Sequence, residues 1–145
     1  LRTSRGLGDV YKRQDFIFTT DDTKFGDTHA KFGLRPTWGM SQTLSQAVGV
    51  RLAKEMSYSA RIILGDEAVR VGLANRAEKN KEDLDNLVDK ISSQISSNSQ
   101  EAVTAFKDLY NLAQSGLGLD EALKAELNKE YPEIKDTNER LSEFK

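Results

Sequence analysis

Apolar residues recur three or four positions apart through the C-terminal half of the chain, as they do on one face of an amphipathic helix. Three such stripes occupy residues 84–95, 103–113 and 119–131. Pro132 cannot continue the third helix, and a short amphipathic tail follows it to Lys145. The pattern therefore predicts a helical region over 78–145.

The pattern before residue 78 is mixed. Aromatic and β-branched residues favour short strands, and glycine and proline punctuate the loop over 33–39. The predicted elements are a strand over 15–19, a helix capped by Ser41 and running to about Tyr58, a short helix from Asp66 to Gly72, and a strand over 73–77. We therefore expect an α/β (α+β) fold, in which a strand–loop–helix part over 15–77 precedes the helical region.

Composition excludes several kinds of site. The 145 residues include 21 Lys and Arg, 23 Asp and Glu, one His and no Cys, for a net charge of −2. Without Cys there is no disulfide, thiolate metal site or cysteine nucleophile, and one His cannot form a multi-histidine metal site. A nearly neutral chain is poorly suited to electrostatic binding of nucleic acid, and no apolar run approaches the ~20 residues of a membrane span. We expect no metal, no nucleic-acid partner and no membrane span.

Residues 1–14 differ from everything after them. The segment Ser4–Gln14 reads SRGLGDVYKRQ, a polar and cationic run without helical or alternating period. It resembles, residue for residue, the in-frame translation of a transposase-type sequencing adaptor; a basic tail, solvated or binding a partner, is the other interpretation. We expect residues 1–14 to be an artefact, and the true N-terminal half of the protein to be missing. Without their four basic residues and one acid, 17 basic and 22 acidic residues remain, a net charge of −5.

Residues 15–76 carry an ordered set of short motifs. These are Lys24-Phe25-Gly26, then His29 three positions on, the run Gly33-Leu34-Arg35-Pro36-Thr37-Trp38-Gly39-Met40, the pair Val48-Gly49, and Asp66-Glu67-Ala68 followed by Gly72-Leu73-Ala74-Asn75-Arg76. In order and spacing this segment resembles the enoyl-CoA hydratase/isomerase (crotonase) superfamily. Beyond residue 76 the resemblance rests on the helix pattern alone.

The resemblance implies a fold and an activity. The family fold is a spiral of ββα units followed by C-terminal helices that form trimers, so we expect part of that core over 15–77 and an oligomerisation region over 78–145. The family binds acyl-CoA thioesters and stabilises an enolate with two backbone N–H groups. Those groups, and the first catalytic Glu of hydratases, belong to the family's N-terminal half, upstream of Asp15. The implied partners are an acyl-CoA substrate and a homotrimer or dimer of trimers. The implied cofactor set is empty apart from the CoA of the substrate, and the implied location is cytoplasmic, with a mitochondrial or peroxisomal one left open.

His29 is the candidate catalytic residue, because it stands where hydratases of the resembled family carry their second Glu. An imidazole can exchange protons near neutral pH, but this departure does not support ordinary two-Glu hydration. The other interpretation is a loop or pocket-lining histidine that transfers no proton. Asp27 either orients His29 or, as is common for Asp after Gly, caps the loop backbone.

The candidate acyl pocket follows His29 in the sequence and consists of Leu34, Pro36, Thr37 and Trp38. Some isomerases and a dehalogenase of the resembled family carry a catalytic Asp where Thr37 stands, and a threonine has no useful base strength. Trp38 either lines the pocket beside Pro36 or packs under the start of the next helix.

Three functions follow from these observations. The first is an enoyl-CoA hydratase/isomerase-family enzyme of which this chain is the C-terminal half. The second is a non-catalytic acyl-CoA binder of the same fold, and the third is a helical module whose apolar stripes pack on a partner. On the first interpretation the isolated chain should be inactive and poorly stable, because its strand edges and helix faces are uncovered.

Overall fold

The computed structural model describes residues 14–37, 39–131 and 134–142. Packing divides the chain into two compact units that meet inside one helix, between Val88 and Asp89. The foreign segment expected over 1–14 lies almost wholly outside the described residues. The domain boundaries expected at 14 and 77 stay predictions.

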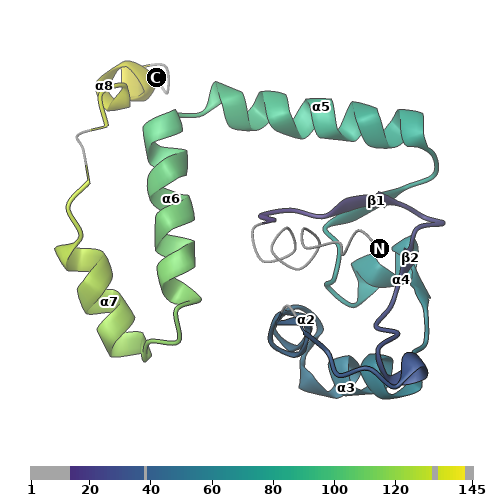
Figure 1. The fold of residues 1–145 in the computed structure, drawn as a ribbon. Coiled ribbons are helices and arrows are strands. Elements are labelled where there is room, and N and C mark those ends of the chain that lie inside the picture. The colour runs from purple at the N-terminus through teal and green to yellow at the C-terminus, as the bar shows by residue number, and fades with distance from the viewer. Residues whose placement is uncertain (1–13, 38, 132–133, 143–145) are drawn as a thin grey trace, which may run out of the picture. The chain divides into compact units, whose positions relative to one another are not determined.

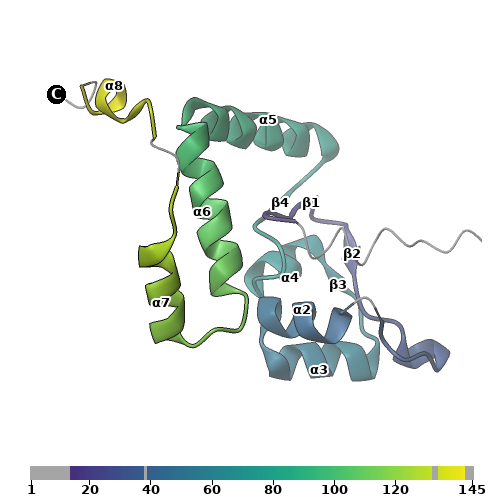
Figure 2. The same ribbon diagram turned by 60° about the vertical axis from the view of Figure 1, so that its left-hand side comes forward.

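Short strands organise the first unit (Figures 1 and 2). Strand β1 (Phe18–Thr20) pairs in parallel with β4 (Arg76–Glu78), and β2 (Lys24–Phe25) pairs antiparallel with β3 (Ile63–Leu64). Helix α4 (Gly65–Arg70) contacts all four strands. The unit is thus a set of small strand pairs gathered around one short helix.

Both strands of the parallel pair begin three residues later than the sequence pattern predicts. The reason is Asn75, whose side-chain Oδ1 accepts a hydrogen bond from the Ile17 amide at 2.8 Å. The Asn75 amide in turn donates to the Ile17 carbonyl at 2.8 Å. The Asn75 side chain therefore replaces the first backbone–backbone pairing, and regular strand pairing starts only at Phe18 and Arg76.

The helix predicted from Ser41 to Tyr58 is two helices, α2 (Met40–Val48) and α3 (Val50–Ser59). Gly49 divides them with φ of 79° and ψ of 153°, a conformation that L side chains rarely adopt. The prediction that Ser41 caps the first helix was wrong, since Gly39 precedes it in the left-handed region. The two helices pack against each other (Figure 2).

Helix α4 begins at Gly65, one residue before the start predicted at Asp66. A Cβ atom at this position would lie 2.0 Å from the carbonyl oxygen of Thr20, so only glycine allows the approach. The Gly65 amide donates to the Asp21 carbonyl at 3.0 Å. Asp66 instead occupies the first turn of α4 and forms an ion pair with Arg70 at 2.8 Å.

The hydrophobic core lies entirely in the first unit. Its buried members come from α2, α3, β3, α4 and the turn before β4, and they are Leu44, Ala53, Met56, Ile63, Ala68, Leu73 and Ala74. Met56 and Ile63 are the largest fully buried side chains, each 1% exposed. Both α3 and β3 contribute to this core. Because β3 pairs with β2 and α3 contacts the loop that follows β2, the core holds the surroundings of that loop in place.

The three predicted stripes each form a helix. These are α5 (Lys81–Ser97), which crosses from the first unit to the second, α6 (Gln100–Ala113) and α7 (Leu119–Asn128), and the tail forms α8 (Thr137–Ser142). Helix α7 contacts α6, and Pro132, predicted to stop it, lies outside the described residues. Among the described residues of these four helices, none is buried.

Candidate acid–base site

The loop that carries His29 belongs to the first unit and begins directly after β2. One 3-10 turn, η1 (Ala30–Phe32), follows His29, which stands at its N-terminal cap. The His29 carbonyl accepts hydrogen bonds from the Phe32 amide at 3.1 Å and the Leu34 amide at 2.9 Å. Helix α3 contacts η1, so the loop is tied to a core helix as well as to itself.

Asp27 lies at the centre of the site and is buried, with 3% of its surface exposed. Its Oδ1 lies 2.6 Å from the ring Nδ1 of His29 and 3.2 Å from the His29 amide nitrogen, which donates to it. Its Oδ2 accepts a hydrogen bond from the hydroxyl of Ser57 at 2.7 Å. Both carboxylate oxygens therefore have partners, one from the loop and one from α3.

Two opposing effects act on the pKa of Asp27. Burial raises it, because the charged carboxylate loses water. Hydrogen bonds from Ser57 and from the ring and amide of His29 stabilise the charged form and lower the pKa, and their sum places it below the ordinary value for aspartate. Asp27 is thus a buried carboxylate that stays ionised beside an imidazole.

The two interpretations of Asp27 are both realised, since it binds the His29 backbone and the His29 ring together. The His29 side chain is 18% exposed, so the ring is held by the loop yet still reaches solvent. This arrangement can hold an imidazole in one orientation and stabilise positive charge on it. Whether the ring transfers a proton stays a prediction.

The predicted acyl-pocket residues lie on the segment between η1 and α2. Leu34 is 60% exposed and joins the His29 carbonyl through its amide. Pro36 and Thr37 are also exposed, and the Thr37 carbonyl accepts from the Met40 amide at 3.2 Å. Trp38 lies outside the described residues. The structure thus brings Leu34 next to His29 through the backbone, and the pocket itself stays a prediction.

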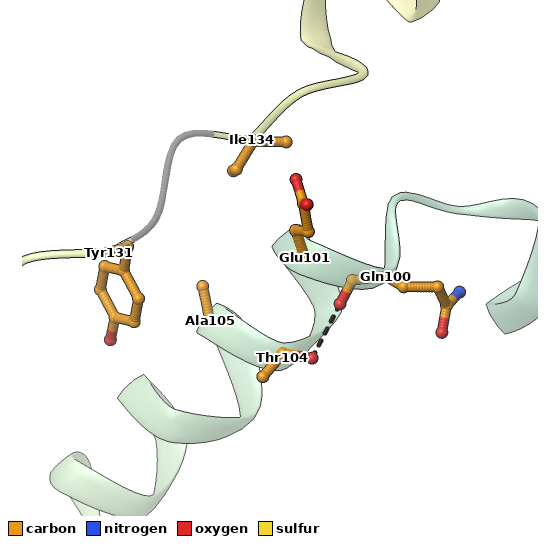
Figure 3. A pocket seen from close by; sticks show the side chains of 6 residues that line it. All are labelled: Gln100, Glu101, Thr104, Ala105, Tyr131 and Ile134. Carbon is orange, nitrogen blue, oxygen red and sulfur yellow. Dashed lines mark hydrogen bonds between the residues drawn. The ribbon is translucent and has the colours of Figure 1, made fainter.

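A hollow lies in the other unit (Figure 3). It has a volume of about 310 Å³ and is lined from α6 by Gln100, Glu101, Thr104 and Ala105, and beyond α7 by Tyr131 and Ile134. Its polar groups are already engaged in structure: Thr104 donates to the Gln100 carbonyl at 2.8 Å, and Glu101 accepts from the Lys135 amide at 2.8 Å. Among the described residues that line this hollow, no two resemble an acid–base pair.

Comparison with known proteins decides the family. The family model for enoyl-CoA hydratase/isomerase matches residues 12–145, beginning just inside the segment expected to be foreign. The chain belongs to the enoyl-CoA hydratase/isomerase family. The resemblance that the motifs indicated is therefore confirmed.

Individual relatives agree with this family. The protein named "Probable enoyl-CoA hydratase 1, peroxisomal" from Arabidopsis thaliana is 34% identical over 116 residues, which are 80% of this chain and 42% of the relative. A short-chain-enoyl-CoA hydratase from Clostridioides difficile is 30% identical over 132 residues, 90% of this chain and 84% of the relative. The solved enoyl-CoA hydratase from Mycobacterium smegmatis is 34% identical with a TM-score of 0.67, covering 81% of this chain and 55% of that one. The crotonase fold is confirmed, and the chain spans less than half the length of its plant relative.

Sequence reasoning about this family member missed Ser57. Its signal was present but weak: Ser57 is four residues after the buried Ala53 and follows the buried Met56, so it borders the inner face of α3. A hydroxyl at the edge of an apolar face needs a hydrogen-bond partner, and the partner here is thirty residues away in sequence.

The described residues offer neither a metal site nor a membrane-spanning helix. Within residues 14–37, 39–131 and 134–142, no three or more His, Asp or Glu side chains come together as a metal site would require. In the same residues, no helix combines the length and the apolar character that crossing a bilayer demands.

Proposed function

We propose that this chain is part of an enzyme that adds water to, or shifts the double bond of, an enoyl-CoA thioester through an oxyanion-stabilised enolate. Family membership and relatives named enoyl-CoA hydratase support the substrate class. The observation that carries the proposal is the buried carboxylate of Asp27, which lies 2.6 Å from Nδ1 of His29. The motif resemblance assigns His29 to the acidic catalytic position of the family.

His29 is the proton-transfer group in this proposal. In hydration, the imidazole takes a proton from water as the water oxygen bonds to the β carbon. The π electrons move toward the thioester to give an enolate, and the imidazolium returns a proton to the α carbon. Isomerisation uses the same group to remove a proton from one carbon and return it to another. Asp27 supplies the negative charge that stabilises the imidazolium between the two transfers.

The proposal also needs groups that stabilise the thioester oxygen and contact the acyl chain. By the family resemblance, the two backbone N–H groups that hold the thioester oxygen, and a first catalytic Glu, belong to the N-terminal half of the family fold. Leu34, Pro36, Thr37 and Trp38 are proposed to contact the acyl chain, and no cofactor beyond the CoA of the substrate is required. A homotrimer or dimer of trimers would cover the exposed apolar faces of the C-terminal helices. A cytoplasmic location stays a prediction, since the plant relative is named as peroxisomal.

The test is hydration of crotonyl-CoA by a protein that joins these residues to a complete N-terminal half, followed as loss of the conjugated enoyl absorbance. His29→Ala should lower kcat by about 10²–10⁴-fold with little change in KM, since general acid–base catalysis contributes on that order. His29→Glu restores the acid of the family pattern and should retain turnover. Lys54→Ala, an exposed change on α3, is the control and should leave both constants unaltered.

The family resemblance puts His29 where hydratases carry a carboxylate, and this difference also favours a non-catalytic acyl-CoA binder, because thioester binding needs the backbone donors but no acid. Calorimetry with crotonyl-CoA separates the two functions. Tight binding without turnover in the wild-type protein would establish the binder and refute the enzyme. Turnover in the wild type that His29→Ala leaves intact would refute the role of His29.

A further inference from the structure

We propose that Asp27 and Ser57 are positioning residues, which hold the His29 ring in one orientation and one tautomer so that its Nε2 exchanges protons with substrate. This inference rests on the proposed function and names two residues that act through His29. Neither residue belongs to the motif set that identified the family. The support comes from two contacts of the Asp27 carboxylate, one with His29 on the same loop and one with Ser57 on helix α3.

The first contact fixes the ring relative to its own loop. Asp27 Oδ1 binds both the amide nitrogen and the ring Nδ1 of His29, at 3.2 and 2.6 Å. A single oxygen shared by backbone and ring closes a small cycle that sets both the turn into η1 and the side-chain rotation of His29. The carboxylate therefore links the backbone conformation of the loop to the orientation of the imidazole ring.

The second contact fixes the carboxylate relative to the core. Ser57 donates to Asp27 Oδ2 at 2.7 Å from helix α3, whose Ala53 and Met56 are buried. Without this donor the carboxylate could rotate about its own Cβ–Cγ bond and carry the ring with it. The Ser57 hydroxyl thus anchors the Asp27 side chain of the loop to the packed helix α3.

The chemical consequence concerns the tautomer. A buried, ionised carboxylate accepts hydrogen bonds and cannot donate them, so the ring nitrogen beside it must carry the proton. With Nδ1–H committed to Asp27, a neutral His29 presents Nε2 as its basic atom. When Nε2 takes up a proton, the ring becomes a cation that the adjacent carboxylate stabilises.

The chain allows this to be read directly, because it contains a single histidine. Imidazole ¹⁵N chemical shifts of the 145-residue chain report which ring nitrogen carries the proton, at a pH where the ring is neutral. The wild type should show Nδ1–H. Asp27→Asn should lose this preference, since an amide can also donate to Nδ1, whereas Asp22→Asn removes an equal charge from an exposed loop position and should leave the tautomer unchanged. A wild-type ring with Nε2–H would overturn the proposal.

The second measurement is the steady-state kinetics of crotonyl-CoA hydration by the protein that includes a complete N-terminal half. Asp27→Asn should lower kcat by roughly 10²-fold or more, with KM within about a factor of two. Ser57→Ala should lower kcat by about tenfold, the effect of one hydrogen bond to a charged group. Ser57→Thr keeps a hydroxyl and should recover most of this loss. Ser59→Ala removes a hydroxyl from the same helix that bonds the Glu55 carbonyl instead, and should change nothing.

Circular dichroism checks that each variant folds. Should Asp27→Asn fail to fold, the Ser57→Ala and Ser57→Thr pair decides the question alone, since the alanine variant must lose turnover that the threonine variant keeps. A loss confined to KM or to stability, or equal loss in the two serine variants, would make the contacts merely structural and overturn the proposal.

The two proposals fail in different ways. An Nδ1–H tautomer that depends on Asp27, in a protein that turns over no enoyl-CoA, would uphold the positioning and refute the enzyme. Turnover that His29→Ala abolishes but Asp27→Asn and Ser57→Ala leave intact would uphold the enzyme and refute the positioning.

Discussion

Helices α3 and α6 are both amphipathic, but they use their apolar residues in opposite ways. In α3, Ala53 and Met56 are buried in the core of the first unit, with Met56 only 1% exposed. In α6, Phe106 is 60% and Tyr110 is 69% exposed, and neither α6 nor α7 buries a residue. One helix is part of a finished core, whereas the other presents its apolar side chains to solvent.

The difference teaches what a hydrophobic stripe can and cannot establish. Period alone indicates that a helix forms and which face is apolar, but not what covers that face. Apolar side chains gathered on one face of a helix usually mark a surface that meets another part of the protein or another chain. The predicted oligomer would cover the α6 and α7 faces, and this stays a prediction.

The largest expected effect comes from truncating one side chain in each region. Met56→Ala should lower the free energy of unfolding by about 2–5 kcal/mol, since it removes a fully buried side chain and leaves a cavity. Leu127→Ala, at a side chain 85% exposed, should change it by less than about 0.5 kcal/mol. Urea unfolding of the two variants measures both values. Equal losses would break the comparison and mean that the α7 face is covered in solution.

A glycine pair gives the next effect. Gly65→Ala should cost about 3 kcal/mol, because its Cβ would lie 2.0 Å from the Thr20 carbonyl oxygen and a backbone must move. Gly118→Ala, before α7, meets nothing within 4 Å and has φ of −64°, so it should be neutral or stabilise by up to about 1 kcal/mol. Thermal unfolding compares the two. A harmless Gly65→Ala would contradict the close approach.

Low pH should destabilise each of the two units through one aspartate whose pKa is lowered. The pKa values of Asp27 and Asp136 are both lowered, Asp27 by Ser57 and His29 against the opposing effect of burial, and Asp136 by Arg140 and Ser99. A lowered pKa in the folded state adds stability above the pKa of the unfolded state, and this stability is lost as pH falls through the folded pKa. Asp27→Asn and Asp136→Asn should therefore each flatten part of the acid limb, measured by urea unfolding from neutral pH to about pH 2.

Salt sharpens the acid experiment. The contribution of Asp136, which pairs with Arg140 at the surface, should largely disappear in about 1 M salt, whereas that of the buried Asp27 should persist. Equal salt sensitivity of the two variants would mean that Asp27 is as solvated as Asp136.

The smallest expected effect is an increase in the free energy of unfolding. Ala60 ends α3 with φ of 51°, the left-handed region that costs a residue with a Cβ about 1 kcal/mol. Ala60→Gly should therefore raise the free energy of unfolding by up to about 1 kcal/mol. Ala105→Gly, inside α6, should lower it by about the same amount. A shift in melting temperature of the same sign in both variants would refute the conformational explanation.

Much of the fold could be predicted because its helices follow local pattern. The three stripes after residue 78 became α5, α6 and α7, and the motif order placed the chain in its family. The split at Gly49 could not be predicted, because glycine also occurs inside helices and Val48 and Val50 both continue the apolar pattern. The late start of β1 depends on the Asn75 side chain, a partner 58 residues away in sequence.

The candidate site was predictable to the extent that its residues are close in sequence. His29 and Asp27 are two positions apart, so their interaction could be considered from the sequence alone. Ser57 could not, since its bond to Asp27 depends on how α3 packs beneath the loop. Helix pattern reports that Ser57 borders the inner face of α3 but not which group it meets there.

The hydrogen bonds around His29 have a consequence for evolution. Its amide and its carbonyl bind Asp27, Phe32 and Leu34 through backbone atoms that every residue other than proline possesses. The loop therefore holds its shape with bonds that do not depend on which side chain occupies position 29. A lineage could exchange glutamate for histidine there by one amino-acid substitution, and we expect the neighbouring Asp27 to orient the new group. The loop could therefore carry different acid–base side chains at position 29 without a change in its backbone conformation.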